Sequence, residues 1–293
     1  MFSALLVFFF TYIPHINIFL TLLPLFYSNY QLFYVLFLIN IFLMQLPVSS
    51  NSFKLKILDI IFERHNSIII FDEKKEYYNK RYIYGYHPHG NLPIGIACCK
   101  NNDNFRNTLL AVSWQALYVP CYKIFYYFAG GIITVSKKSL LENIKKTDKN
   151  IMLVPGGIKE MLYNNNENIC LNTKNKGFIK IAINEGLDLI PIFCFGENDL
   201  YINITKSIEK FTYKYFKILI PSILVNKKYL PTSEKEVKLT YIIGKPIQVN
   251  KNINASQEEI NKLHTLYYNS IMDIYNKYKV RLNEKRDLIF VTE

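Results

Sequence analysis

The sequence predicts an α/β protein in which a mixed, substantially parallel sheet is flanked by helices and preceded by an N-terminal transmembrane helical hairpin. From residue 54 onward, short apolar runs rich in β-branched residues alternate with segments of helical periodicity, a pattern typical of parallel sheets. Residues 1–53, in contrast, contain no Lys, Arg, Asp or Glu, although the chain of 293 residues carries a net charge of +12. We therefore expect a membrane hairpin at 1–53 and a main domain at 54–293.

Two apolar runs make up the N-terminal stretch, Met1 to about Phe26 and about Gln31 to Val48. Each approaches the roughly 20 residues that span a bilayer as a helix. A cleavable signal peptide would need a basic start and a small-residue cleavage site, which are missing here. A buried soluble hairpin would be unusual at this length without charges. Because Lys54 and Lys56 follow the second run directly, the positive-inside rule predicts that the main domain and both termini are cytosolic.

Charge and cysteine usage narrow the functional classes. A basic surplus suits nucleic acid, an anionic membrane or acidic substrates, and the apolar N-terminal stretch favours the membrane. The five cysteines are odd in number and form no CxxC pair, which argues against a disulfide framework and a zinc knuckle. We expect the main domain in a reducing compartment and expect no nucleic-acid partner.

The elements of the main domain are predicted from apolar runs bounded by turn residues and from helical spacing. Strands are expected at 68–71, from 82 to the histidines at 87 and 89, and at 109–112, 132–135, 151–154, 189–193 and 239–243. Helices are expected at 54–64, 118–128, 137–146 and 176–184, the last ended by Gly186, and from a capping box at Ser256 and Glu259 to about Val280.

An amphipathic segment at 206–219 has two interpretations. Apolar residues recur near one helical face at 208, 211, 215, 216 and 219, and lysines at 206, 210, 214 and 217 lie around the other. The segment is either a surface helix packed on the core or a helix that lies on an anionic membrane.

The first candidate site is the end of the strand that begins at 82. Pro88 cannot donate to a sheet, and Gly90 permits unusual backbone angles, so His87 and His89 are set at the rim of the sheet. Residues two apart in an extended segment project to the same side. One imidazole could remove a proton from a hydroxyl while the other orients it or stabilises an oxyanion. The alternatives are two locally hydrogen-bonded histidines, or a zinc site, for which no third ligand is nearby.

A second candidate site is the turn formed by Pro155, Gly156 and Gly157 after a predicted strand, with Glu160 three residues further on. Backbone N–H groups at such a turn could hold an acyl carbonyl oxygen or a phosphate. Glu160 could pair with an imidazole. The alternative is a tight turn followed by a solvated carboxylate.

A third group of candidates lies after the second turn. Lys176 and Gly177, with further lysines at 174 and 180, could bind the phosphates of a coenzyme A thioester or could form a solvated helix face. Gly196 and Glu197 follow another predicted strand at the same rim. No Gly-x-Ser-x-Gly elbow is present, so the sequence does not favour a covalent serine mechanism.

Taken in order, these motifs resemble the diacylglycerol acyltransferase 2 family, which includes monoacylglycerol and wax-alcohol acyltransferases. The resemblance covers about residues 54–285 and rests on Tyr84–Gly90, Gly130–Ile132, Pro155–Gly157 with Glu160, Lys176–Lys180, Pro191–Phe193, Phe195–Asn198, Gly244–Ile247 and the predicted helix that holds His264 and Tyr267.

The resemblance implies a glycerolipid-acyltransferase-like fold and an acyl-CoA-dependent O-acyltransferase of the endoplasmic reticulum membrane and lipid droplets. Its partners would be acyl-CoA, as a substrate without further cofactor or metal, and a neutral lipid acceptor. Diacylglycerol, converted to triacylglycerol, is the expected acceptor; a monoacylglycerol or a long-chain alcohol is the alternative. A lysophospholipid acyltransferase, a non-catalytic lipid-droplet protein and a homo-oligomer stay open.

Site residues carry over from the motifs. His87 and His89 inherit the active-site role, with His89 favoured as general base by analogy with glycerophospholipid acyltransferases, and Glu160 is a third catalytic candidate. The expected substrate-binding residues are Pro88, Gly90, Pro155, Gly156, Gly157, Lys176, Gly177, Gly196 and Glu197.

The sequence also departs from related patterns. The phospholipid enzymes carry an aspartate five residues after the histidine, where this chain has Leu92 after His87 and Ile94 after His89. The group that orients the histidine is therefore not identified from the sequence. Asn175 stands where the family usually has arginine, and the stretch from Tyr201 to Lys238 is short for the family.

Overall fold

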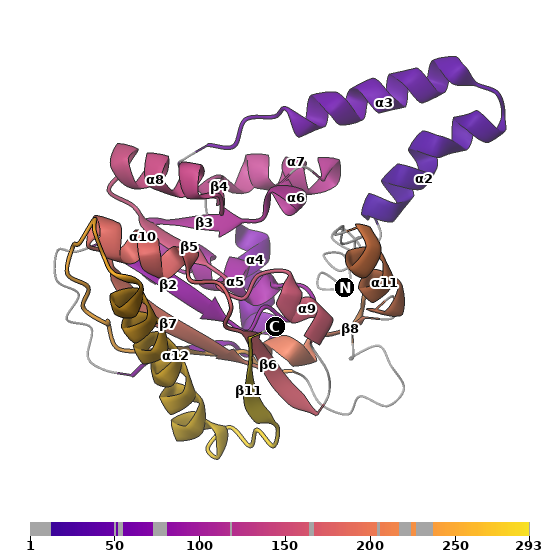
Figure 1. Ribbon diagram of the computed structural model, residues 1–293. Helices are drawn as coiled ribbons and strands as arrows, with labels where there is room; N and C mark the ends of the chain where they lie inside the picture. The colour runs from indigo at the N-terminus through magenta and orange to yellow at the C-terminus, as the bar shows by residue number, and fades with distance from the viewer. Residues whose placement is uncertain are drawn as a thin grey trace.

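The computed structural model describes residues 13–49, 51, 55–72, 81–117, 119–163, 167–203, 206–216, 224–226 and 237–292. Their main feature is a seven-stranded sheet of order β1-β10-β7-β2-β5-β3-β4 (Figure 1). Its strands are β1 (Ile68–Phe71), β2 (Tyr82–His87), β3 (Thr108–Val112), β4 (Ile132–Thr134), β5 (Asn150–Leu153), β7 (Asp188–Phe195) and β10 (Thr240–Ile243). All neighbouring strands are parallel except β10 and β7. The predicted mixed, substantially parallel sheet is thus confirmed.

Helices cover both faces of this sheet. On one face, α4 (Lys56–Arg64), α5 (Ile94–Asn101) and α7 (Pro120–Ala129) contribute to one apolar core. On the other face, α8 (Lys137–Lys146), α10 (Gly177–Glu185) and α12 (Gln257–Lys279) contribute to a second core. Side chains of β2 alternate between these cores, because Tyr82, Tyr84 and Tyr86 join the first and Ile83 joins the second.

Further helices and strands lie outside these two layers. They are α6 (Trp114–Leu117), α9 (Lys159–Tyr163) and α11 (Lys206–Phe216), with 3-10 turns at Asp103–Phe105 and Glu197–Asp199. Two further two-stranded sheets pair β6 (Asn168–Asn172) with β11 (Asp287–Val291) and β8 (Tyr201–Asn203) with β9 (Leu224–Asn226). Helix α5 and these four strands are not predicted from the sequence, because the segments are short and lack a clear periodicity.

Two helix boundaries agree with their sequence signals. The side chain of Ser256 accepts a hydrogen bond from the Glu259 backbone N–H at the start of α12. The Glu259 carboxylate instead accepts from Asn252, so one half of the predicted capping box forms. Helix α10 ends at Gly186, whose left-handed conformation (φ 68°) allows the helix to stop there.

Helices α2 (Ile13–Phe26) and α3 (Tyr30–Met44) form a helical hairpin, which projects from α7 (Figure 1). In the part of the chain that the structure describes, no helix combines the length and apolar character that crossing a membrane requires. The predicted hairpin is therefore present, but its transmembrane character is not shown. Residues 1–12 of the first predicted run, Lys54, residue 118 and residues 217–219 lie outside the described residues.

Candidate active site

The predicted motifs are far apart in the sequence, but they meet at one edge of the sheet, the edge formed by the carboxyl ends of its central strands. Strands β7, β2 and β5 are neighbours and parallel, so their carboxyl ends lie side by side. The histidine motif follows β2, the turn at Pro155–Gly157 follows β5, and Gly196 with Glu197 follows β7. Ligand sites of open α/β sheets lie at this edge.

His89 lies at the wall of a cavity at this edge. Its Nδ1 atom lies 3.1 Å from the backbone oxygen of Gly90. A carbonyl oxygen accepts and cannot donate, so Nδ1 carries the proton and Nε2 keeps its lone pair. Burial lowers the pKa of His89 below its usual 6.5, which keeps the ring neutral near pH 7. The orienting group is thus a backbone carbonyl, which every residue has and no sequence motif reveals.

His87 has a different environment from His89. It lies on the same face of β2 as Ile83 and Gly85, so it faces the core beneath α12, where it is fully buried. Its Nε2 lies 3.0 Å from the hydroxyl oxygen of Tyr267. Burial lowers its pKa to about 3. The expectation that both imidazoles project to the same side is wrong, because the strand ends at His87 and the turn carries His89 to the cavity.

Glu160 supports the histidine motif through the backbone. Its carboxylate accepts hydrogen bonds from the N–H groups of His89, at 2.8 Å, and Asn172, at 3.0 Å. Burial raises its pKa to about 8, against the opposing effect of these two donors. The carboxylate lies 3.9 Å from Nδ1 of His87, which is too long for a hydrogen bond. A Cβ at Gly156 would lie 1.7 Å from the Glu160 Oε1, so glycine makes room for this carboxylate.

Glu197 lies beneath the same motif on its other side and is also buried. Its carboxylate accepts a hydrogen bond from the Tyr86 hydroxyl at 2.6 Å and one from the Gly95 N–H at 3.3 Å. Burial raises its pKa to about 8. Its side chain is packed under Gly90 and does not line the cavity. Glu160 and Glu197 thus hold the histidine motif from two sides.

Lys176 and Gly177 stand at the start of α10, outside the cavity. The Lys176 ammonium donates to the Asn261 side chain at 2.7 Å. The neighbouring Asn175 amide donates to the backbone oxygen of Pro155 at 3.0 Å, so this segment packs directly on the glycine turn. The structure therefore brings the lysines near the turn but does not place them at His89.

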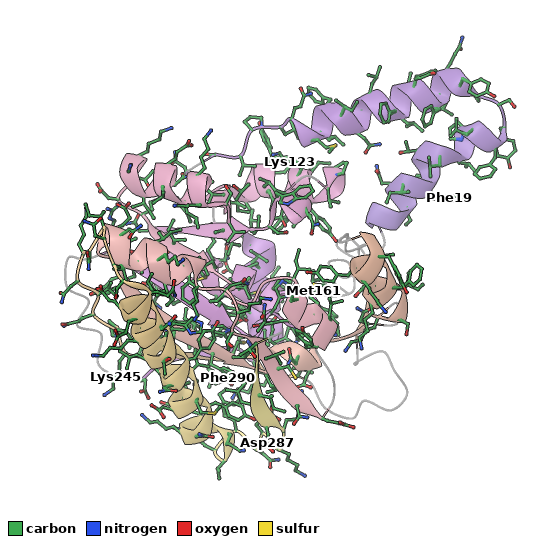
Figure 2. The ribbon with its side chains drawn as sticks, in the orientation of Figure 1. Phe19, Lys123, Met161, Lys245, Asp287 and Phe290 are labelled. Carbon is green, nitrogen blue, oxygen red and sulfur yellow. The ribbon has the colours of Figure 1, made fainter. Side chains whose placement is uncertain are left out.

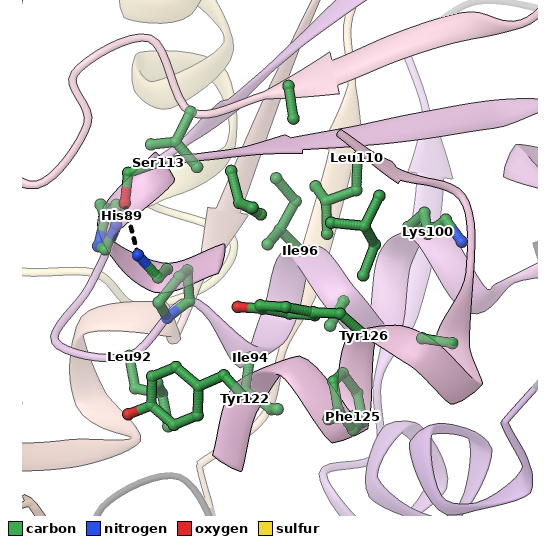
Figure 3. A pocket seen from close by; sticks show the side chains of 18 of the residues that line it. His89, Leu92, Ile94, Ile96, Lys100, Leu110, Ser113, Tyr122, Phe125 and Tyr126 are labelled. Atoms are coloured by element: carbon green, nitrogen blue, oxygen red, sulfur yellow. Dashed lines mark hydrogen bonds between the residues drawn. The ribbon is translucent and has the colours of Figure 1, made fainter. Parts of the chain in front are cut away.

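The cavity itself was not predicted from the sequence. It has a volume of about 290 Å³, and its walls come mainly from apolar side chains of α5, α7 and β3, with Met161 added by α9. Figure 3 shows His89 at one end and Lys100 at the other, with Ile96 and Tyr126 between them. Lys100 is buried, and its ammonium donates to the Gly130 oxygen over a long 3.4 Å. Burial lowers its pKa to about 8.

An apolar cavity with a neutral histidine at its end is suited to a lipid chain whose polar end reacts at that histidine. No group of three His, Cys, Asp or Glu side chains placed to hold a metal ion occurs among the described residues. An open α/β sheet with an apolar cavity at the ends of its strands is typical of enzymes that act on lipids.

The chain belongs to the diacylglycerol acyltransferase family, whose profile matches residues 25–291. It is 30% identical to mouse (Mus musculus) 2-acylglycerol O-acyltransferase 1 over 71% of this chain and 69% of that protein. It is also 30% identical to diacylglycerol O-acyltransferase 1 of Schizosaccharomyces pombe, over 68% of this chain and 64% of that protein's length. A crystal structure of 1-acyl-sn-glycerophosphate acyltransferase from Thermotoga maritima aligns over 93% of this chain and 94% of its own, with 11% identity and a TM-score of 0.45.

Proposed function

We propose that this protein is an acyl-CoA-dependent O-acyltransferase that esterifies diacylglycerol to triacylglycerol, with His89 as the general base. The observation that carries the proposal is the position of His89: its side chain stands at the end of an apolar cavity, and its Nε2 is unprotonated. The cavity holds the acyl chain, and its end at His89 is where the thioester reacts.

The reaction needs one proton acceptor and no covalent bond between the acyl group and the enzyme. Nε2 of His89 takes the proton as the acceptor hydroxyl attacks the thioester carbonyl carbon. The tetrahedral intermediate then breaks its C–S bond, and the coenzyme A thiolate takes the proton from the imidazolium. The products are an ester and free coenzyme A, and His89 is again neutral. His87 and Glu160 act as positioning residues for the loop that bears His89.

The polar part of acyl-CoA has a fitting surface outside the cavity. Lys174 and Lys180 are exposed on either side of Gly177, and Lys176 is partly exposed there. This segment packs on the turn at Pro155–Gly157, and Gly157 lines the cavity. Coenzyme A phosphates bound to these lysines would leave the thioester close to the cavity.

The acceptor is a neutral lipid alcohol. The two relatives described above are named for 2-acylglycerol and for diacylglycerol, and both are 30% identical to this chain. We favour diacylglycerol because the matching family profile carries that name. Monoacylglycerol and long-chain alcohols are the competing acceptors in the test below.

We place the protein at the endoplasmic reticulum membrane or on lipid droplets, with the main domain and both termini in the cytosol. The support is the hairpin, because apolar side chains are exposed along α2 and α3, among them that of Phe19 (Figure 2). Monomeric soluble proteins rarely expose so large an apolar surface. Helix α3 packs on α7, whose side chains line the cavity, so lipid around the hairpin would lie close to the cavity.

The proposal is tested by expressing the protein in cells that make no neutral lipid of their own. Microsomes with the full chain should convert labelled acyl-CoA and diacylglycerol to triacylglycerol, more efficiently than they esterify monoacylglycerol, long-chain alcohols or lysophosphatidate. His89→Ala should abolish the conversion while the protein stays folded, and added imidazole should restore part of it. Full activity of His89→Ala would exclude His89 as the base, and transfer to lysophosphatidate alone would exclude a neutral-lipid enzyme.

A further inference from the structure

Helix α11 presents its apolar face to solvent and its acidic residue to the protein. Ile208, Phe211 and Tyr215 recur at helical spacing and are 54%, 57% and 61% exposed. Glu209, on the opposite face, is fully buried and accepts a hydrogen bond from Asn203 at 2.7 Å. A surface helix packed on a core would bury its apolar face, so the structure contradicts the first of the two interpretations from the sequence.

The exposed face of α11 is also basic. Lys210 and Lys214 are exposed next to the apolar residues, and the Lys214 ammonium lies 5.4 Å from the centre of the Tyr215 ring. Because Glu209 is buried, no carboxylate of the helix offsets these charges. An apolar stripe bordered by lysines matches the interface of a bilayer with anionic lipids, where aromatic rings enter the headgroup layer and ammonium groups contact phosphates.

The position of α11 relates it to the cavity. Helix α11 packs against α9, whose Met161 lines the cavity, and the hairpin packs on α7, whose side chains line it as well. In Figure 1, α11 and α2 lie on the same side of the molecule, and α12 lies across from them. Two elements that expose apolar side chains, the hairpin and α11, thus each contact a helix that lines the cavity.

We propose that α11 is a second membrane contact, which lies in the interface of an anionic bilayer with Ile208, Phe211 and Tyr215 inserted. The inference rests on the proposed membrane association and adds to it a specific element and a preference for anionic lipid. Together with the hairpin, α11 would hold the cavity against the membrane, where its lipid acceptor resides.

Tryptophan fluorescence can test α11 without interference from the hairpin. The chain has one tryptophan, Trp114, so Tyr215→Trp in a Trp114→Phe background gives a single reporter. The full protein is mixed with phosphatidylcholine vesicles with or without phosphatidylserine, made with lipids brominated on their acyl chains. The reporter should shift to shorter wavelength and be quenched, more strongly with phosphatidylserine. Leu266→Trp, at a residue that is 53% exposed on α12, is the matched control and should not be quenched.

A paired charge reversal completes the test. Lys210→Glu with Lys214→Glu should reduce quenching at position 215 and binding to anionic vesicles, while acyl transfer in detergent micelles stays unchanged. An unquenched reporter at 215, or equal quenching at 266, would overturn the inference even if the vesicles still bind the protein through the hairpin. Loss of activity in micelles would also overturn it, because α11 would then act on the active site itself.

Discussion

Replacing Gly156 with alanine should detach the buried Glu160 carboxylate from the loop that carries His89. Gly156 has a backbone conformation that alanine can adopt, so the only obstacle is space. Its new Cβ would lie 1.7 Å from Oε1 and 2.2 Å from Cδ of Glu160, far inside contact distance. Glu160 must then move, which leaves the N–H groups of His89 and Asn172 without their acceptor.

The magnitude follows from these two donors. A buried N–H group without a partner costs about 1–3 kcal/mol, so Gly156→Ala should lower the free energy of unfolding by about 2–6 kcal/mol. The acyl-transfer rate should fall as well, because His89 loses the bond that fixes its backbone. Denaturant unfolding of the detergent-solubilised protein measures the first effect, and transfer of labelled acyl groups to diacylglycerol measures the second.

Gly157→Ala is the matched control for this substitution. A Cβ at 157 would meet no atom within 4 Å, but the residue has a φ of +61°. We expect a loss of about 1–2 kcal/mol from backbone strain, with Glu160 in place and with a smaller loss of activity. Wild-type activity of Gly156→Ala would refute the reasoning, since the contact of Glu160 with the His89 backbone would then be dispensable.

Four further predictions follow from the site. His89→Ala should reduce kcat by about 10²–10⁴-fold. Tyr267→Phe leaves Nε2 of His87 without its partner, so it should lower the free energy of unfolding by about 1–3 kcal/mol and leave kcat unchanged. A comparable loss of kcat in both variants would contradict the separate roles. Lys100→Ala should lengthen the cavity and shift acyl-CoA preference to longer chains, while Lys100→Met, which keeps the length of the side chain, should not. If both variants show the same activity across a panel of acyl-chain lengths, Lys100 does not form the end of the cavity. Because burial raises the pKa of Glu197 from 4.5 to about 8, its contribution to stability is complete at acid pH and is lost as pH rises through this range, by about 1.4 kcal/mol per pH unit. Glu197→Gln should remove that slope from denaturant midpoints measured between about pH 5 and pH 8, and an unchanged slope would mean that Glu197 is ionised in the folded state.

Much of the fold follows from local patterns in the sequence. The strands of the seven-stranded sheet are predicted because each is a short apolar run bounded by turn residues. Helix α8 agrees with its predicted bounds, and Ser256 and Gly186 mark helix ends through local hydrogen bonding and a left-handed backbone. The family was also identified from the sequence, because its motifs keep their order along the chain. All of these signals involve residues close together in the sequence.

Tertiary structure alone gave the two histidines different environments and created the cavity. His87 and His89 are two residues apart, but the end of β2 places one beneath α12 and the other at the cavity. The partners of Glu160, Glu197 and His87 come from distant segments or from backbone groups, which no local pattern specifies. The outward apolar face of α11 is decided in the same way, because a helical pattern fixes which residues share a face but not which face meets the core.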